Sequence, residues 1–397
     1  MAGPLLLIYA APLHLAISLI LSMRHRPVFA TRFSVFAALL AATVIYVSLN
    51  SGSTGELSSY VAAVEMGNAC FLAALLLLLR DPVRDCRHEA QKEEAAQMPY
   101  WRRLWWALSL TYSHRGVGWN YQVAHLPLRP THTRRNFIAS RIARLALHGL
   151  LMDVVHSYMS LDPILSASRD TVAELRLQRP WLFVFDSGVW VLYFYTGYNI
   201  VYDALSLAAV ASGCSEPNAW PVSFGRWTDA YTVRRFWGRV WHQMLRHSVS
   251  GLGKACARAL RCAPGSWASS HVQLFAAFAL SGAAHALGDC VLGIPGASIR
   301  FFVAQALAIT LEDAVVAGGT RLGVVDTPAV RMCGFVWTAA WVSYSNAWLG
   351  LAGPQLEAGH AHGQVATVSF VRPVLRYAAA VTGVDILKLV EAFVKGP

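Results

Sequence analysis

The sequence has few charged residues. Only 14% of its 397 residues are Asp, Glu, Lys or Arg, whereas soluble proteins carry about 25%, and 55% are hydrophobic. This shortage excludes the two or three soluble domains that the length would otherwise hold, and it indicates one integral-membrane domain over residues 1–397. The net charge of +11 comes without a lysine-rich stripe or an RNA-binding aromatic motif. Nucleic acid is therefore not expected as a partner, because loop topology and anionic lipid head groups account for the basic residues.

The usual sequence motifs of metal and nucleotide sites are also missing. The seven cysteines are scattered and form no CxxC pair, so neither a disulfide framework nor a zinc site is indicated. No Walker loop, GxSxG elbow, HExxH or GxGxxG stands in a fitting context. Gly116 and Gly118 in RGVGW are too few to cradle phosphates. The sequence therefore indicates neither a nucleotide hydrolase nor a metalloprotease, and it predicts no metal and no bound cofactor.

Long apolar runs occupy most of the chain and predict an all-α fold. Most of them are about long enough for a helix to cross a hydrocarbon core of about 30 Å. We therefore expect a polytopic bundle of about eight or nine transmembrane helices. The fourth run contains two histidines and an aspartate, which makes it the weakest. The nine runs are 4–21, 33–49, 61–79, 142–161, 181–211, 272–292, 301–317, 332–351 and 374–394.

Two basic sections separate groups of apolar runs. Residues 80–140 combine ten Lys or Arg with several tryptophans, which is typical of amphipathic helices lying at the head-group boundary. Residues 213–270 form the second basic section, and 213–292 is the region that carries the motifs. Alternation of the spans after the N-terminal group, 1–79, places both sections on one side, which the positive-inside rule makes the cytosol. The expected location is the endoplasmic reticulum. The Arg-poor loops fall on the other side, whereas 161–180 fits less well; those loops are 50–60, 292–299 and 352–370.

The apolar run 272–292 contains a histidine about two-thirds of the way along, where a polar side chain is costly inside a membrane. His285 follows four small residues, of which Ser281 and Gly282 would let another helix or a ligand approach closely. Burial favours a neutral imidazole, which suits a general base that takes a proton from an attacking hydroxyl. Asp289 lies four residues further on, on the same helix face, and is the expected orienter of the ring. The alternative is a histidine satisfied by an interhelical hydrogen bond.

The stretch FWGRVWHQMLRHSVS, residues 236–250, gathers aromatic rings, arginines and histidines. If it is helical, Arg235, Arg239 and His242 share one face, which would meet the phosphates of a nucleotide-like donor. The aromatic side chains would enter the lipid boundary. The alternative is an amphipathic helix beside the membrane with ordinary basic flanks. Besides the two arginines, the expected donor side comprises Phe236, Trp237, Trp241 and Gln243.

Glu312 and Asp313 are adjacent carboxylates inside the run 301–317. Carboxylates within a span are expensive and usually face the interior of the bundle. They would pair either with an arginine or with a histidine on the substrate side. The alternative is an ion pair with a purely structural role.

FWGRVWHQ followed by a span containing SGAAH resembles the wax-synthase-like branch of the membrane-bound O-acyltransferases. RGVGWN at 115–120 and FGRWTDAYTVRRFW at 224–237 resemble the fungal members, which look like acetyltransferases of terpenoid and meroterpenoid pathways. These motifs cover roughly residues 115–290. The resemblance implies a helix bundle around a catalytic chamber, with acyl-CoA arriving from the cytosol and a lipophilic alcohol from the membrane.

The resemblance also implies roles for two residues. His285 matches the catalytic histidine of the family, and His242 stands where related branches place a polar residue after the tryptophan. His285 would deprotonate the acceptor hydroxyl, which attacks the thioester of acetyl-CoA directly, while His242 polarises the carbonyl or positions the donor. Acetyl-CoA is then a co-substrate. Sequence alone does not show the acceptor alcohol or the oligomeric state.

Other interpretations stay open at this point. A long-chain wax or sterol ester synthase would share these motifs, because pocket volume sets the length of the acyl chain. A transporter would use His285 and the carboxylates at 312 and 313 as a proton relay, but paired broken helices in matching halves are missing. A structural or scaffolding membrane protein leaves both histidines unexplained.

Overall fold

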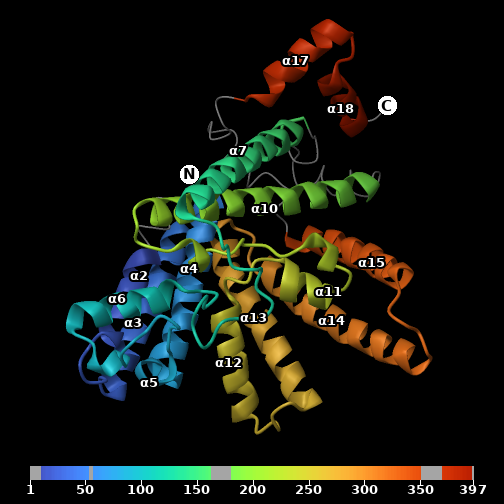
Figure 1. Cartoon of the computed structure of the whole chain (residues 1–397). Helices are drawn as coiled ribbons and strands as arrows, with labels where there is room; N and C mark the ends of the chain where they lie inside the picture. Colours follow the sequence, from blue (N-terminus) through green and yellow to red (C-terminus); the bar gives the residue numbers. More distant parts are fainter. Residues whose placement is uncertain (1–9, 53–56, 162–179, 350–368, 396–397) are drawn as a thin grey trace. The chain divides into compact units, whose positions relative to one another are not determined.

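The computed structural model describes the chain except for residues 1–9, 53–56, 162–179, 350–368 and 396–397. The described residues are helical, and their only β pairing is an isolated bridge between His88 and Trp119. The expected all-α fold is therefore confirmed for this part of the chain. Figure 1 gives the helix labels used below.

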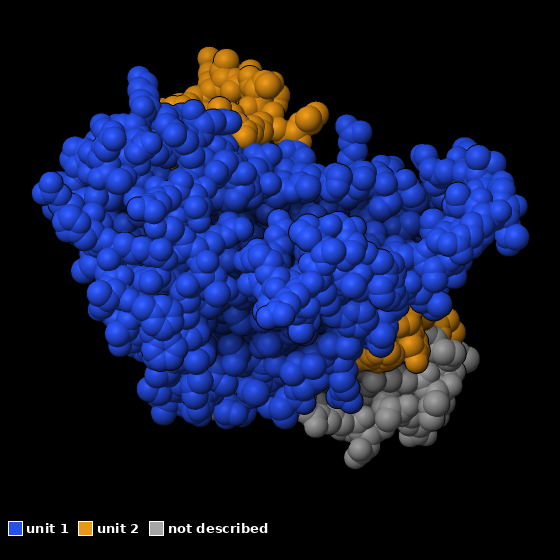
Figure 2. All heavy atoms as spheres, turned by 90° about the horizontal axis from the view of Figure 1, so that it is seen from below, with its two compact units in different colours: residues 1–127, 224–338 blue, residues 128–223, 339–397 orange. Residues whose placement is uncertain are grey.

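The chain forms two compact units, each made of two separate segments. Unit 1 comprises residues 1–127 and 224–338, and unit 2 comprises residues 128–223 and 339–397 (Figure 2). Both polar stretches singled out in the sequence, around His242 and around His285, belong to unit 1. This unit therefore carries the candidate site.

The helices of unit 1 come from both of its segments. The first segment contains α2 (Ala11–Leu21), α3 (Phe29–Asn50), α4 (Leu57–Ala73) with its π-helical continuation η2 (Ala74–Leu79), α5 (Pro82–Asp85), η3 (Ala95–Gln97) and α6 (Tyr100–Tyr112). The second contains η5 (Trp227–Asp229), α11 (Val233–Arg235), the π-helical η6 (Phe236–Val240), α12 (Arg246–Ala259), α13 (Trp267–Val291), α14 (Ala297–Arg321) and the first part of α15 (Pro328–Asn346).

Four helices in the described part of the chain are long and apolar enough to cross a membrane. They correspond to the second, third, sixth and seventh expected spans, and α2 is a shorter apolar helix. All four lie in unit 1, where α13 packs against both α12 and α14 (Figure 1). The other expected spans stay predictions, except the last one. The four helices are Phe29–Asn50, Ser58–Leu79, Trp267–Val291 and Ala297–Arg321.

The expected span over 374–394 is wrong. This segment forms two helices, α17 (Val371–Thr382) and α18 (Ile386–Lys395), which are separated at Gly383. Gly383 has φ +74°, a left-handed conformation that ends α17 and favours glycine. At 1.5 Å per residue the two helices reach about 18 and 15 Å, which is too short for a core of about 30 Å.

Close packing between α4 and α13 positions the helix that carries His285. A Cβ added to Gly67 on α4 would lie 2.8 Å from Leu287, and one added to Gly288 would lie 2.4 Å from the ring of Tyr60. Only glycine fits at such distances without a shift of its neighbour. Small residues at crossing points let helix backbones approach within a membrane protein. The register of α13 against α4 is therefore fixed within one turn of His285.

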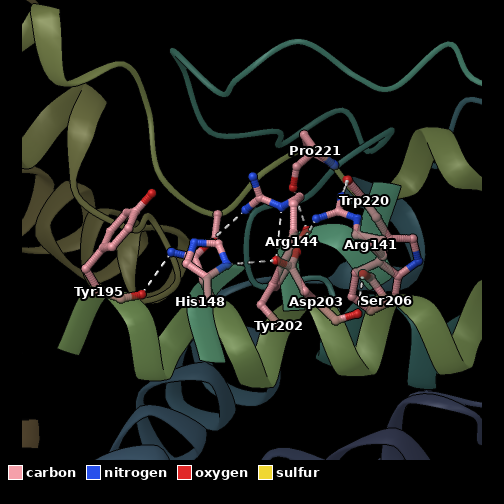
Figure 3. Close-up of polar contacts among 11 residues, drawn as sticks. Arg141, Arg144, His148, Tyr195, Tyr202, Asp203, Ser206, Trp220 and Pro221 are labelled. Carbon is pink, nitrogen blue, oxygen red and sulfur yellow. Dashed lines mark hydrogen bonds and ion pairs between the residues drawn. The ribbon is translucent and has the colours of Figure 1, made fainter. Parts of the chain in front are cut away.

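Unit 2 is built around α7 (Arg134–Met159) and α10 (Pro180–Ala211), which are joined by a buried ionic cluster (Figure 3). Asp203 on α10 accepts hydrogen bonds from Arg141 and, at 3.0 Å, from Nε of Arg144. Arg144 also donates to Asn199, and Arg141 donates to the carbonyl of Trp220. The cluster thereby ties both helices to the loop that follows α10. Unit 2 also contains η4 (Pro217–Ala219), the end of α15, η7 (Ala347–Leu349), α17 and α18.

Asp153 is the carboxylate inside the fourth expected span, and its hydrogen bonds explain why a charge is tolerated there. The side chain projects from α7 and accepts hydrogen bonds from the hydroxyl of Ser369 and from the backbone N–H groups of Phe370 and Val371. A carboxylate stabilises the unsatisfied N–H groups at a helix start. Asp153 therefore caps α17.

Candidate active site

Helix α13 fixes both the position and the tautomer of His285. Its Nδ1 lies 2.8 Å from the carbonyl oxygen of Ser281, one turn earlier. Because a carbonyl oxygen only accepts, Nδ1 carries the proton and Nε2 keeps its lone pair. The imidazole is half-buried, with its centroid 4.6 Å from the ring of Phe302 and 6.3 Å from the ring of Tyr60. A histidine held in this way has a basic nitrogen available on its far edge.

Asp289 does not orient His285 as the sequence suggested. Its Oδ2 accepts from the backbone N–H of Ser298 at 2.7 Å, and its Oδ1 accepts from the Ser298 hydroxyl at 2.7 Å. The carboxylate is buried and satisfies the first turn of α14. The i, i+4 spacing does place Asp289 on the histidine's side of α13, but the backbone N–H and the hydroxyl of Ser298 on the next helix bind its carboxylate. The partner of the imidazole is the Ser281 carbonyl.

The small residues before His285 serve helix packing. A Cβ on Gly282 would lie 3.1 Å from Cα of Ile299 and 3.3 Å from Cβ of Phe302, both on α14. The sequence left a helix and a ligand as alternative neighbours, and the structure places a helix there. This packing brings Phe302 against the imidazole.

The 236–250 stretch is not one continuous helix. Residues Phe236–Val240 form a π-helical turn, Trp241 is extended with φ −67° and ψ 154°, and α12 begins only at Arg246. The shared face expected for Arg235, Arg239 and His242 is therefore not formed. The extended backbone at Trp241 changes the direction of the chain, whereas the expected amphipathic helix would have continued straight.

The tryptophan of this turn joins it to the two apolar helices. Nε1 of Trp237 donates to Oε1 of Gln305 on α14 at 3.2 Å. Its ring lies 5.9 Å from that of Phe278 on α13 and 5.8 Å from that of Phe302 on α14. Since Phe302 also contacts His285, one aromatic wall runs from the turn to the imidazole. Trp237 therefore forms part of the aromatic wall of the candidate site. The sequence had suggested that its ring enters the lipid boundary.

The two arginines of the expected donor side differ in their contacts. Nη2 of Arg235 lies 2.6 Å from a carboxylate oxygen of Asp229, and its guanidinium stacks 4.2 Å from the centroid of Tyr231. Its charge is therefore already paired. Arg239 is half-buried, and no ion pair of Arg239 is formed with the described residues. Of the two, Arg239 is the one whose charge is not paired with a carboxylate of the described residues.

Gln243 braces the turn from within. Its Nε2 donates to the carbonyls of Trp237 and Trp241, at 2.8 and 2.6 Å, and its Oε1 accepts from Arg246 at 2.8 Å. Arg246 also donates to the carbonyls of Gly238 and, in the preceding segment, Ala124. Both side chains thus hold the backbone that presents the aromatic residues. Gln243 was expected on the donor side, but its polar atoms are used inside the loop.

His242 lies beside the aromatic wall and close to His285. Its ring centroid is 5.6 Å from that of Trp241 and 5.9 Å from that of Phe224. Burial lowers the pKa of His242 to about 3, with further lowering by His285 and by the positive charge of Arg115. This electrostatic influence indicates that the two histidines, 43 residues apart in sequence, lie near each other. His242 is neutral at physiological pH.

Arg115 is the residue of this region that sequence reasoning missed. It begins the RGVGWN motif, which was considered only for its glycines, and it is buried with 4% of its surface exposed. A buried arginine is stable only where its surroundings supply hydrogen-bond acceptors or negative charge. The sequence signal that could have identified Arg115 is its place in RGVGWN, a motif that resembles the fungal acetyltransferases.

Glu312 and Asp313 serve as anchors for the segment before the turn. Glu312 is buried and accepts from the backbone N–H groups of Val233 and Arg234, at 2.8 and 3.1 Å, and from the indole of Trp337. Asp313 forms a bidentate pair with the guanidinium of Arg234. Of the alternatives, pairing with an arginine is the one that the structure shows. Within the described part of the chain, neither carboxylate contacts a histidine.

Comparisons with known proteins converge on one family. A model described as the membrane bound O-acyl transferase family matches residues 220–304. Acetyltransferase ple2 of Rhodocybe pseudopiperita is 38% identical over 322 residues, which cover 77% of this chain and 83% of that protein. Acetyltransferase eriL of Hericium erinaceus is 32% identical over 323 residues, covering 78% of this chain and 83% of that protein. No solved structure matches the chain.

The family match and the structure concern the same residues. The matched segment contains the π-helical turn, His242, α13 with His285 and the start of α14. The relatives extend over more than three quarters of the chain. The protein is therefore an acyltransferase enzyme with apolar helices suited to a membrane. The chain belongs to the membrane-bound O-acyltransferase family.

Proposed function

We propose that the protein transfers an acetyl group from acetyl-CoA to a hydroxyl group of a membrane-soluble terpenoid or meroterpenoid, with His285 as the general base. The acetyl donor is supported by the relatives, which are called acetyltransferases. The observation that carries the mechanism is the contact between Nδ1 of His285 and the Ser281 carbonyl. It leaves Nε2 as the basic nitrogen.

The reaction is a direct displacement at the thioester. Nε2 of His285 takes the proton of the acceptor hydroxyl while the oxygen attacks the acetyl carbonyl carbon. A C–O bond forms, the C–S bond breaks, and the imidazolium returns its proton to the sulfur of the departing CoA. Such proton transfer contributes about 10²- to 10⁴-fold to a rate. No covalent enzyme intermediate is required.

His242 acts on the donor carbonyl in this mechanism. A neutral imidazole keeps one N–H, which donates to the carbonyl oxygen as negative charge develops there. The lowered pKa of His242, caused by burial first and then by His285 and Arg115, supports the neutral form. Arg115 adds positive charge near the same oxygen. Arg239, which pairs with no described carboxylate, is assigned to the phosphates of CoA.

The routes of the two substrates and the orientation in the membrane are assigned from the sequence pattern. The acceptor reaches a chamber within the bundle from the lipid, and acetyl-CoA reaches it from the side of the two basic sections. We assign that side to the cytosol and the protein to the endoplasmic reticulum, because Arg-rich loops stay on the cytosolic face. The apolar helices Phe29–Asn50, Ser58–Leu79, Trp267–Val291 and Ala297–Arg321 form the core of this bundle.

Membranes from cells that express the chain provide the test. They are supplied with labelled acetyl-CoA and a panel of lipid-soluble terpenoid alcohols, and both labelled ester and released CoA are measured. We expect ester with the wild type and a loss of at least about 10²-fold in turnover for His285→Gln. The matched control is His271→Gln on the same helix, whose Nδ1 also contacts a backbone carbonyl, that of Trp267 at 2.9 Å.

Each other outcome identifies a different function. Full turnover of His285→Gln removes this residue as the base. A preference for palmitoyl-CoA over acetyl-CoA indicates a wax or sterol ester synthase. Flux of a terpenoid alcohol across sealed vesicles with neither ester nor released CoA indicates a transporter.

A further inference from the structure

A second group of histidines and a carboxylate converges in unit 1, among residues that the proposed reaction does not use. His14 comes from α2, Glu65 from α4 and His114 from the turn after α6. Nε2 of His14 lies 3.7 Å from Oε1 of Glu65, and Nε2 of His114 lies 3.5 Å from the same oxygen. The three ligand atoms all lie within 4.8 Å of one another.

The tautomer of His14 is fixed by its backbone contact. Its Nδ1 lies 3.0 Å from the carbonyl oxygen of Ala10, which only accepts, so Nδ1 carries the proton. Nε2 therefore has a lone pair, and this buried atom has no hydrogen-bond partner among the described residues. Its nearest charged neighbour is the Glu65 oxygen, which is also an acceptor. Two acceptors facing each other repel unless a proton or a metal cation lies between them.

Asn68 connects His114 to the rest of the cluster. The hydroxyl of Ser248 donates to Oδ1 of Asn68 at 2.7 Å, so the NH2 group of Asn68 faces Nδ1 of His114 at 3.2 Å and Oε1 of Glu65 at 3.5 Å. Nδ1 of His114 then accepts, and its Nε2 carries the proton that points at Glu65. An ion bound at Nε2 would take the place of this proton, with the amide of Asn68 turned over so that its oxygen accepts from Nδ1.

His14 therefore has the arrangement that metal ligands adopt, and His114 reaches it when the amide of Asn68 turns over. In metal sites the imidazole nitrogen opposite the metal usually donates to a backbone carbonyl or a polar side chain. Here Ala10 and Asn68 take those roles. Donor atoms around a tetrahedral zinc ion are about 3.4 Å apart, given bonds of about 2.0–2.2 Å, so the two contacts with Glu65 need only small changes. The ion would also replace the weak 3.5 Å contact between Asn68 and Glu65.

We propose that His14, Glu65 and His114 bind a divalent transition-metal ion, for which zinc is the best match. Two imidazoles and one carboxylate are a common zinc donor set, with a fourth position for water. The ion joins α2, α4 and the turn after α6. Because Arg115 follows His114 directly, the same ion holds the segment that presents Arg115 to His242. The metal is assigned to positioning and not to the transfer step.

This site was not visible in the sequence, which predicted no metal. The ligands are 51 and 49 residues apart, so no short spacing motif links them. Only the packing of three separate elements brings them together.

Metal analysis of the full-length chain tests the proposal. The protein is purified in detergent without chelators, and its zinc content is measured by plasma mass spectrometry. We expect about one ion per wild-type chain, retention in Glu65→Asp and a fall to below about a tenth in Glu65→Gln and His14→Gln. The control His271→Gln retains the metal, because its ring makes the same kind of backbone contact on exposed α13 surface. Asn68→Ala weakens affinity by about 10- to 100-fold.

A second measurement does not depend on the folding of variants. Wild-type protein stripped with a chelator is titrated with Co²⁺, whose tetrahedral complexes absorb visible light. Saturation at about one equivalent, with displacement by Zn²⁺, supports the site. The proposal is overturned if the wild type carries no metal and binds no Co²⁺, or if Glu65→Gln and His14→Gln retain the metal of the wild type. Acetyl transfer is measured separately, so this result is distinct from the test of His285.

Discussion

Replacing Glu312 by glutamine should destabilise unit 1 far more than replacing its neighbour Asp313 by asparagine. Glu312 is 8% exposed and accepts from two backbone N–H groups, those of Val233 and Arg234, and from the indole of Trp337. Asp313 is 37% exposed in its side chain and pairs with the guanidinium of Arg234. Both substitutions replace a carboxylate by an amide. They differ in how deeply the side chain is buried and in which hydrogen-bond donors lose their acceptor.

The magnitude follows from those donors. Glutamine keeps one acceptor oxygen and turns an NH2 group toward the remaining backbone N–H. A hydrogen bond to a charged group contributes about 1.5–3 kcal/mol, and a buried donor left unsatisfied costs about 1–3 kcal/mol. Glu312→Gln should therefore cost about 2–4 kcal/mol. An exposed ion pair contributes about 1 kcal/mol or less, which bounds the effect of Asp313→Asn.

Thermal unfolding of the full chain in detergent measures the difference. For a unit of this size about 1 kcal/mol shifts Tm by about 2–4 °C, so we expect a fall of about 4–16 °C for Glu312→Gln and less than about 4 °C for Asp313→Asn. Acetyl transfer should also fall in Glu312→Gln, since its donors immediately precede the turn Phe236–Val240. Equal shifts, or a larger shift for Asp313→Asn, would show that Glu312 does not anchor this segment.

Three further outcomes can be checked on the same protein. Gly288→Ala should lower stability by about 1–3 kcal/mol, because its Cβ would lie 2.4 Å from Tyr60, whereas Gly318→Ala in open space should leave Tm unchanged or slightly raised. For His242, whose pKa falls from 6.5 to about 3, the unfolded state alone binds a proton between these values, so stability declines as pH falls below 6.5. Thermal unfolding at pH 5 and 7.5 should show about 2 kcal/mol of this loss, which His242→Gln removes. Arg239→Gln should raise KM for acetyl-CoA about tenfold with little change in kcat, and an unchanged KM would exclude a phosphate contact.

The sequence was informative where a single residue conflicts with its surroundings. A histidine in a span of small apolar residues is rare, so His285 could be chosen as a candidate before any helix packing was known. The apolar runs likewise predicted the helices that carry it. The prediction of a span over 374–394 was wrong because the composition of this segment is apolar, whereas Gly383 divides it into two short helices.

Contacts between distant segments could not be predicted in the same way. Asp289 shares a helix face with His285, but the backbone N–H and the hydroxyl of Ser298 on α14 bind it. The role of Arg235 depends on Asp229, and that of Gln243 depends on a loop conformation that includes a π-helical turn. Spacing within one element predicts faces, whereas the choice of partner depends on the elements that pack against it. The cluster of His14 with two distant ligands is the extreme case.

The central claim is that His242 and His285 act on one transition state. The most direct measurement is turnover of labelled acetyl-CoA by His242→Gln, His285→Gln and the variant with both substitutions. We expect a loss of at least about 10²-fold for His285→Gln and a double variant scarcely slower than it, because residues that act as a unit are not additive. Losses that multiply in the double variant, or full turnover by His285→Gln, would contradict a shared site.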